Sequence, residues 1–255
     1  MHVEVHEGHG PLLLLVHGIC SSRAQWRPNL AGLAEFCTPV VVELLGHGRS
    51  ESPEDSAAYT AEAYIGRFEA IRADLGAERW LVCGQSFGAG LTLGYALAHP
   101  ERVIAQVFTN SASALGEDRP RPSDEAITNR IVALEARGRA AFETMPFYPK
   151  RTGRLAAEVE EELIADAALI TLAGMARTLS VTSQGLAMMS RLGEVTTPTL
   201  LVNGVREKSF QPLRDRAATA LPSLEIVDLQ GGHPVNLDRP DEFNAAVRAF
   251  VGRHL

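Results

Sequence analysis

Residues 84–88 read Gly-Gln-Ser-Phe-Gly, so that one serine lies between two glycines. The stretch follows a short apolar run, 79–83, and precedes an apolar segment of helical length, 89–99. Between a strand and a helix, G-x-S-x-G is typical of a sharp elbow that holds the serine in a strained conformation and exposes its hydroxyl. The positive end of the following helix then lies beneath the serine, where negative charge develops during acyl transfer. These features predict that Ser86 is a nucleophile.

One histidine stands where a general base is needed. Residues 229–243 read LQGGHPVNLDRPDEF, in which two glycines turn the chain after an apolar run and His233 follows them. Such a loop lies at the edge where open α/β sheets gather their reacting groups. We therefore expect His233 to take the proton from Ser86. The other histidines, His17 apart, lie in turns or near the chain ends and are predicted to be solvated or structural.

A loop after the first apolar run could hold an oxyanion. His17 ends that run, and the backbone N–H of Ile19 can pair with the N–H of Phe87, which directly follows the serine. Two such donors make an oxyanion hole. We expect His17 to brace the loop by hydrogen bonding and Cys20 to be a buried structural thiol.

The acid that orients the histidine is predicted to be Glu207, in the turn VNGVREKSF (202–210). A carboxylate there can accept the far N–H of the imidazole and fix its tautomer. Glutamate reaches about 1.5 Å farther than aspartate. Asn110 at the end of an earlier strand carries no charge, and Glu117 and Asp118 lie farther along the chain. Asp228 lies within a strand, close to the histidine in sequence. An acid elsewhere, or a dispensable acid, is the alternative.

Short apolar runs alternate with helical segments along most of the chain. Runs of this length, rich in Val, Ile and Leu, are typical of strands that are covered on both faces. Their alternation with helices predicts an α/β fold with a doubly wound, mostly parallel sheet. The opening segment, 2–6, alternates instead and suits an edge strand. The predicted inner strands are 11–18, 39–46, 79–86, 102–110, 198–204 and 224–231.

The strand pattern stops for more than eighty residues in the middle of the chain. Segments 123–143 and 155–180 carry helical patterns there, and Ser123 with acids after it is a typical helix start. The strand pattern resumes at Pro198, which indicates an insertion into one sheet. The predicted division is a core of residues 1–110 and 197–255 and an inserted helical cap of residues 111–196.

Composition excludes several classes of function. The 255 residues are 45% hydrophobic and 22% charged, which is typical of a globular protein, and the formal charge of −7 argues against nucleic acid or an anionic membrane as partner. Cys20, Cys37 and Cys83 occur singly, which indicates neither zinc nor disulfides. No run approaches a membrane span, and the first residues lack the layout of a signal peptide. We expect a cytoplasmic monomer or homodimer without metal or cofactor.

Five motifs, taken in order, resemble the α/β-hydrolase superfamily of serine esterases, lactonases and C–C bond hydrolases. The resemblance implies that Ser86 attacks a carbonyl, that His233 takes its proton, and that an acid orients the histidine. It also implies that the N–H groups of Ile19 and Phe87 hold the oxyanion, and that the insertion is a helical cap. The motifs are HG (17–18), ELLGHGRS (43–50), GQSFG (84–88), TLLVNGVRE (199–207) and GGHPVNLDRPDEF (231–243).

The chain departs from this pattern at two places. The superfamily usually reads aspartate-leucine-proline before GHGRS, where Glu43, Leu44 and Leu45 stand here, in a turn expected to shape the pocket floor. The acid motif is commonly G-x-x-D, where Gly204 and Glu207 stand here. Glutamate also occurs as the acid in the superfamily.

The predicted activity is hydrolysis of a small carboxylic ester or lactone through an acyl-enzyme at Ser86. One alternative is a cofactor-free lyase or C–C bond hydrolase that uses the same pair, because GVREKSFQ (204–211) resembles the turn of a superfamily member that eliminates pyruvate. Another is a small-molecule receptor of this fold. Arginines of the insertion (Arg130, Arg137, Arg139 and Arg177) are expected to be mostly solvated. An apolar pocket in this region would be lined by side chains of the insertion, although plain packing is the more common role for each one taken singly: Phe142, Met145, Phe147, Met188 and Met189.

Overall fold

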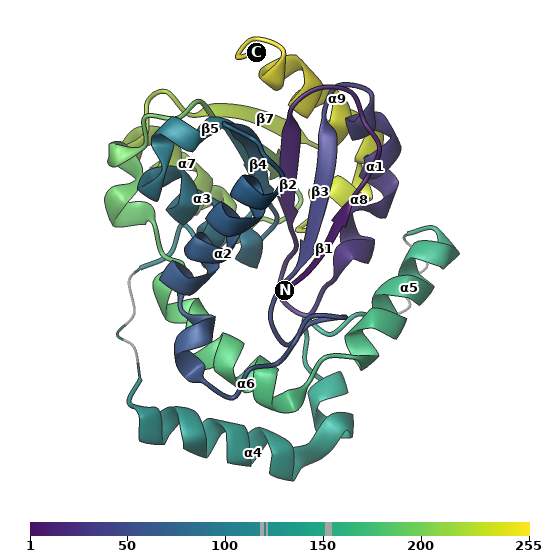
Figure 1. Ribbon diagram of the computed structural model, residues 1–255, viewed down its shortest axis with the longest axis vertical. Helices are drawn as coiled ribbons and strands as arrows, with labels where there is room; N and C mark the ends of the chain where they lie inside the picture. Colours follow the sequence, from purple (N-terminus) through teal and green to yellow (C-terminus); the bar gives the residue numbers. More distant parts are fainter. Residues whose placement is uncertain (118–119, 121, 151–154) are drawn as a thin grey trace.

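The computed structural model describes residues 1–117, 120, 122–150 and 155–255. The described residues form a seven-stranded sheet in the order β1-β3-β2-β4-β5-β6-β7. β1 pairs antiparallel with β3, and every other neighbouring pair is parallel, which confirms the predicted fold class (Figure 1). The strands are β1 His2–Val5, β2 Leu12–Val16, β3 Thr38–Glu43, β4 Trp80–Gly84, β5 Val103–Thr109, β6 Thr199–Gly204 and β7 Glu225–Leu229.

Helices cover both faces of the sheet (Figure 1). One face carries α1 (Arg27–Ala34), α8 (Val235–Asp238) and α9 (Pro240–Val251), and the other carries α2 (Ala61–Asp74), α3 (Phe87–Ala98) and α7 (Gln211–Ala220). The inner strands are apolar on both sides for this reason, which is why they read as continuous runs in the sequence.

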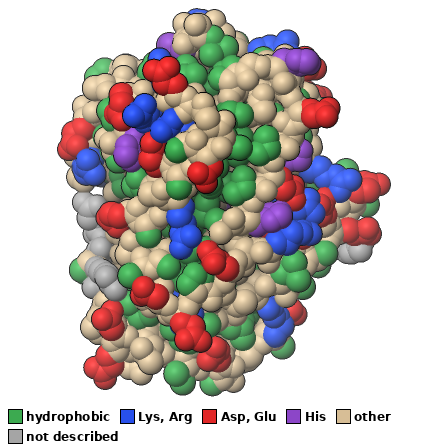
Figure 2. Space-filling view, viewed as in Figure 1, with side chains coloured by type: hydrophobic (Ala, Val, Ile, Leu, Met, Phe, Trp, Pro, Cys, Tyr) green, Lys and Arg blue, Asp and Glu red, His purple; other side chains and the backbone are tan. Residues whose placement is uncertain are grey.

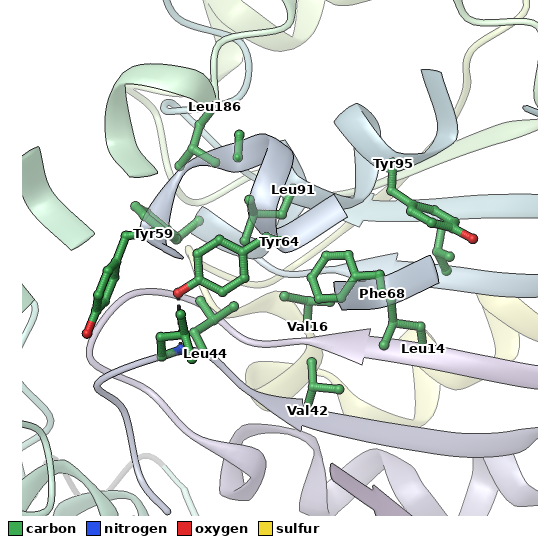
Figure 3. Packing of buried hydrophobic residues seen from close by; sticks show 14 of the residues in the cluster. Leu14, Val16, Val42, Leu44, Tyr59, Tyr64, Phe68, Leu91, Tyr95 and Leu186 are labelled. Atoms are coloured by element: carbon green, nitrogen blue, oxygen red, sulfur yellow. Dashed lines mark hydrogen bonds between the residues drawn. The ribbon is translucent and has the colours of Figure 1, made fainter. Parts of the chain in front are cut away.

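Alternate residues of β2 contribute to the two cores. Leu15 packs among residues of α1 and α9, whereas Leu14 and Val16 pack in the cluster that contains Tyr64 and Phe68 of α2 (Figure 3). Each of these side chains is fully buried. The strand that leads to the oxyanion loop is therefore fixed from both faces.

The candidate residues all follow the carboxyl ends of parallel strands. Ile19 follows β2, Ser86 follows β4, Asn110 follows β5, Glu207 follows β6 and His233 follows β7. The strands lie side by side in this order, so that one edge of the sheet gathers the five segments. The chain runs from β2 to β3 on one side of β2, and then from β3 to β4 on the other side. Ligands bind at such a switch point in open α/β sheets.

The described residues between β5 and β6 form helices and no strand. These are α4 (Asp124–Glu143), α5 (Ala157–Ala168), α6 (Leu172–Ser180) and the short 3-10 helices η4 (Thr182–Gly185) and η5 (Met189–Glu194). α4 and α6 pack against each other across the end of the sheet at which β2 and β4 finish (Figure 1). α4 bends at Gly138, whose φ of 74° is left-handed.

The helical pattern over 155–180 is divided into two helices. The chain breaks at residues 169–171, where the side chain of Thr171 accepts a hydrogen bond from the N–H of Gly174 and caps α6. In the described part of the chain, no single helix has both the length and the apolar composition needed to cross a membrane. One bent pair, Ala157–Ala168 with Leu172–Gly185, meets that test together.

Charged side chains of both signs are interspersed over the face in Figure 2. Cys20, Cys37 and Cys83 are free and buried. No group of three or more His, Cys, Asp or Glu side chains within the described ranges could hold a metal ion.

Candidate active site

Ser86 lies at the elbow between β4 and α3 in a strained backbone conformation, with φ 50° and ψ −110°. Glycine is required on both sides of the serine, at Gly84 and Gly88, because neighbouring backbone atoms leave no room for a Cβ. A Cβ at Gly84 would lie 2.5 Å from the carbonyl oxygen of Gly88, and a Cβ at Gly88 would lie 2.4 Å from that of Val16. The elbow thus packs tightly against the carboxyl end of β2, and this contact holds the serine at the carboxyl ends of the strands.

Three side chains form a continuous hydrogen-bonded chain. His233 Nε2 lies 2.7 Å from Ser86 Oγ, and His233 Nδ1 lies 2.9 Å from Glu207 Oε2. Because a carboxylate only accepts, Nδ1 carries the proton and Nε2 is free to accept from the serine hydroxyl. The side chains of His233 and Glu207 are 43% and 21% exposed. The structure therefore brings together the three residues predicted from the sequence.

Asn110 fixes the carboxylate of Glu207. Its Nδ2 donates to Glu207 Oε2 at 2.8 Å, the same oxygen that accepts from His233. The amide is itself held by Gly204, whose carbonyl accepts from Nδ2 and whose N–H donates to Oδ1, both at 2.9 Å. Burial raises the pKa of the Glu207 carboxyl, but the hydrogen bond and charge of His233, together with the Asn110 amide, outweigh burial and lower this pKa.

The acid turn and the histidine loop are joined through their backbones. The N–H of Val205 donates to the carbonyl of Leu229 at 3.1 Å, and that of Arg206 donates to Gly231 at 2.9 Å. A Cβ at Gly204 would lie 2.0 Å from the carbonyl oxygen of Gly232, so that the close approach requires glycine there. These contacts set the distance that a glutamate side chain spans.

The backbone N–H groups of Ile19 and Phe87 are the expected oxyanion donors. In the part of the chain that the structure describes, the N–H groups of Ile19 and Phe87 have no hydrogen-bond partner. Gln25 Oε1 accepts from the N–H of Gly18 at 3.1 Å and anchors the loop. Cys20 adopts a left-handed φ of 55°, which turns the chain directly after Ile19.

A pair of buried histidines braces this loop. His17 Nε2 accepts from the N–H of Leu44 at 3.0 Å, and His47 Nε2 accepts from the N–H of Cys20 at 3.3 Å. Burial lowers the pKa of His17 to about 3 and that of His47 to about 4. Both rings are therefore neutral at ordinary pH and can accept these hydrogen bonds. The expected bracing role of His17 agrees with this arrangement.

A cavity of about 220 Å³ opens at Ser86. Its apolar walls include Ile19 from the oxyanion loop, and Phe147 and Leu163 from the insertion. Two buried glutamines, Gln25 and Gln85, also contribute. The full lining is Gly18, Ile19, Cys20, Ser21, Gln25, Gln85, Ser86, Phe147, Pro149, Leu163, His233, Pro234 and Leu237.

Only one of the five side chains expected at the pocket lines it. Phe147 does, whereas Phe142 and Met145 pack with Cys20 in the cluster of the insertion, and Met188 and Met189 pack beside β6 and α7. The other four are packing residues, which is the more common role expected for each, because helical periodicity identifies a buried face without identifying what covers it. None of the four insertion arginines is a lining residue, and Arg130 and Arg139 donate to backbone carbonyls of the insertion.

The rival acids lie elsewhere. Asp228 accepts from Asn203 at 2.7 Å and from Arg214 at 3.1 Å, and Glu117 is exposed. Asp118 lies outside the described residues. Glu43, where the superfamily usually has aspartate, is fully buried and accepts from the N–H of Arg49 at 2.7 Å. It holds the turn after β3 and does not line the cavity.

Several residues with clear roles in the site were not singled out by the sequence. Asn110 is a neutral amide and is therefore no candidate acid, and its position at the end of the strand beside β6 is the available signal for its role. Asp238 Oδ2 accepts from the N–H of Gly232 at 2.6 Å and orders the histidine loop. Gln25, which holds the oxyanion loop, carries no distinguishing sequence pattern, and His47 lies in the GHGRS motif but was expected only to be solvated or structural.

Two known proteins are similar to this chain over nearly its whole length. Lipase LipV of Mycobacterium tuberculosis (strain ATCC 25618 / H37Rv) is 29% identical over 265 residues, which cover 99% of this chain and 98% of that protein. A protein of Bacillus subtilis (strain 168) named "Putative 2-succinyl-6-hydroxy-2,4-cyclohexadiene-1-carboxylate synthase" is 26% identical over 249 residues, 94% of this chain and 89% of that protein.

The solved structure of an enol-lactonase from Burkholderia xenovorans LB400 superposes with a TM-score of 0.80. It is 20% identical and covers 98% of this chain and 96% of that one, which shows a shared fold. The model of the alpha/beta hydrolase family matches residues 13–246. The chain belongs to the α/β-hydrolase family.

Proposed function

We propose that the protein hydrolyses a small carboxylic ester or lactone through an acyl-enzyme on Ser86. The observation that carries this proposal is the hydrogen-bonded chain from Ser86 Oγ through the His233 ring to Glu207, at 2.7 and 2.9 Å. A hydroxyl that donates to a neutral imidazole, which in turn donates to a carboxylate, is the arrangement that activates a serine nucleophile.

In the first half-reaction, Ser86 Oγ attacks the carbonyl carbon while its proton passes to His233 Nε2. The carbonyl oxygen becomes an oxyanion, and the free N–H groups of Ile19 and Phe87 are its proposed donors. When the tetrahedral intermediate collapses, the carbon–oxygen bond to the alkoxy group breaks and the imidazolium gives its proton to the departing oxygen. In a lactone this oxygen stays attached to the acyl chain.

In the second half-reaction, His233 deprotonates a water molecule that attacks the acyl carbon. The bond to Ser86 Oγ then breaks, and the proton returns from Nε2 to the serine. Glu207 keeps the proton of the imidazole on Nδ1 and stabilises the imidazolium in both halves. The lowered pKa of Glu207 keeps this carboxyl ionised under the conditions in which His233 is active.

Residues 111–196 are proposed to act as a cap that limits the substrate. Phe147, Pro149 and Leu163 belong to this segment and form walls of a cavity of about 220 Å³. Apolar walls of this kind favour a small acyl group with little charge. The likeness to a lipase supports an ester, and a lactone is its cyclic equivalent.

A second candidate is a cofactor-free lyase or C–C bond hydrolase that uses the same Ser86–His233 pair. The relative named as a carboxylate synthase, at 26% identity, supports it. In such a reaction the pair abstracts a proton or cleaves a carbon–carbon bond. This candidate predicts turnover of an acidic carbonyl compound with little activity on any nitrophenyl ester.

Hydrolysis of p-nitrophenyl acetate and butyrate and of a simple γ-lactone tests the proposal. Ser86→Ala should lower kcat roughly 10⁴- to 10⁶-fold, because the serine and histidine act as one unit. Ser223→Ala, at an exposed position between α7 and β7, is the matched control and should keep wild-type rates. Equal turnover by wild type and Ser86→Ala would refute the proposal, and saturable binding without product would indicate a receptor.

A further inference from the structure

The side chain of Gln85 combines burial, contact with the cavity and unused hydrogen-bonding capacity. It directly precedes Ser86, lines the same cavity, and is only 2% exposed. Its backbone N–H donates to Val16 at 2.9 Å, which fixes the main chain. Within the described residues, neither amide atom of the side chain has a hydrogen-bond partner. The other glutamine of the cavity, Gln25, differs because it is occupied with the N–H of Gly18.

The amide of Gln85 lies against the oxyanion loop. A Cβ at Gly18 would come within 2.2 Å of Gln85 Oε1, so that the amide fills the space that a side chain would need. Gly18 directly precedes Ile19, a proposed oxyanion donor. The amide is therefore close to both ends of the reacting centre, the nucleophile and the oxyanion hole.

Unlike the amide atoms of Gln106, those of Gln85 are not fully buried, so that its free donor and free acceptor are open to the cavity and can be satisfied by a molecule bound there. The apolar side chains of the cavity, such as Ile19 and Leu163, cannot hydrogen-bond this amide. A neutral group that both donates and accepts is the best match, and a hydroxyl has this property. A carboxylate would satisfy only the donor and would be desolvated without a counter-charge.

We infer that Gln85 is a specificity-determining residue that hydrogen-bonds a neutral hydroxyl of the substrate within about two or three bonds of the scissile carbonyl. The substrate class is then a hydroxylated ester or lactone. This inference rests on the proposed hydrolase function. The hydroxyl can belong to the acyl part or to the alcohol part, and these two sources are separated by choice of substrate.

The test compares esters that differ in one hydroxyl. For the acyl part the pair is p-nitrophenyl 3-hydroxybutyrate and p-nitrophenyl butyrate, and for the alcohol part it is 2-hydroxyethyl butyrate and propyl butyrate. The wild type should prefer the hydroxylated member of one pair roughly 10- to 100-fold in kcat/KM. In Gln85→Met, which keeps the length of the side chain without its amide, this ratio should fall to about one.

Gln106→Met is the matched control. Gln106 on β5 is fully buried, neither of its amide atoms has a partner, and it does not line the cavity. This variant should keep the wild-type preference. A wild-type ratio near one in both pairs would overturn the inference. So would an unchanged ratio in Gln85→Met, because a purely structural role would lower the rates of both esters together.

Ligand binding to an inactive variant tests the role of Gln85 independently of the proposed hydrolase function. In Ser86→Ala, methyl 3-hydroxybutyrate should bind roughly 10-fold more tightly than methyl butyrate, or 2-hydroxyethyl butyrate than propyl butyrate, as measured by calorimetry. Adding Gln85→Met should remove the difference. This outcome without any wild-type turnover would refute the hydrolase and support Gln85, whereas equal binding of both members in both pairs would overturn the role of Gln85.

Discussion

Replacing Glu207 with glutamine removes the negative charge beside His233 while it keeps the shape of the side chain. The result depends on which amide atom faces the histidine. His233 Nδ1 and Asn110 Nδ2 both lie within 2.9 Å of Oε2. An amide oxygen at this position accepts from both groups, whereas an amide nitrogen would confront the NH₂ of Asn110. Asn110 therefore orients the glutamine so that the tautomer of His233 is preserved.

The expected loss is that of a charge and not of a hydrogen bond. A charge-assisted hydrogen bond is worth about 1.5–3 kcal/mol and a neutral one about 0.5–1.5 kcal/mol, so that the difference is about 1–2 kcal/mol. The Coulomb attraction between a protonated His233 ring and the Glu207 carboxylate, 2.9 Å apart, is about 1.4–6 kcal/mol for an effective dielectric constant between about 80 and 20. Because His233 is 43% exposed, the lower part of this range applies. Glu207→Gln should lower kcat roughly 10- to 100-fold.

The matched experiment removes the orienting amide. Asn110→Ala alone leaves a carboxylate, either oxygen of which accepts from His233, and should lower kcat only a few-fold. In the Glu207→Gln background, Asn110→Ala frees the amide to present its NH₂ to His233, and kcat should fall to roughly 10⁻³–10⁻⁴ of wild type, as wrong-tautomer substitutions do. The loss in the double variant should therefore exceed the product of the two single losses.

Rates with p-nitrophenyl butyrate measure this cycle, and thermal unfolding checks that each variant folds. A 10⁴-fold loss in Glu207→Gln alone would refute the orienting role of Asn110. Near-normal turnover in that variant would mean that another group orients His233. Multiplicative losses in the double variant would also contradict the reasoning.

Three further predictions concern the buried histidines, the nucleophile elbow and the cavity wall. In the folded protein the pKa values of His17 and His47 are about 3 and about 4, whereas in the unfolded chain both return to about 6.5. As the pH falls through about 6.5, these two residues therefore bind protons in the unfolded chain but not in the folded protein. The free energy of unfolding should thus fall by about 3 kcal/mol from pH 7.5 to 5.5, and a flat profile in urea titrations would contradict this. Gly88→Ala places a Cβ 2.4 Å from a backbone oxygen and should cost about 1–3 kcal/mol of stability and most activity; wild-type unfolding would refute it. Phe147→Ala removes a wall of the cavity and should raise KM about 5- to 10-fold with a smaller change in kcat, whereas the reverse pattern would place Phe147 in the chemical step.

The sheet and the elbow could be predicted because their signals are local. Continuous apolar runs such as 11–18 reflect burial on both faces, and the glycines around Ser86 reflect backbone contacts that exclude a Cβ. The order of strands places Ser86, Glu207 and His233 at one edge once a parallel sheet is assumed. The distances between these side chains required the structure.

The role of Asn110 could not be predicted, because it depends on a contact between neighbouring strands and on a neutral side chain. Charge identifies a candidate acid such as Glu207, but it does not identify the neutral amide that holds the acid in place. The wall of the cavity could not be predicted from the sequence either. Leu163 and Phe147 line the same cavity as Ser86 because of how α5 and the turn after α4 pack. The boundaries of the cap, the cytoplasmic location and the oligomeric state stay predictions.

Covalent labelling by a fluorophosphonate probe tests the central claim most directly. The probe phosphonylates only an activated serine, so that tryptic mass spectrometry of the wild type should find one adduct, on Ser86. Ser86→Ala should not be labelled, and His233→Ala should be labelled at least about 100-fold more slowly, because the hydroxyl loses its base. An unlabelled wild type, or an adduct on another serine that persists in Ser86→Ala, would contradict the claim that Ser86 is the nucleophile.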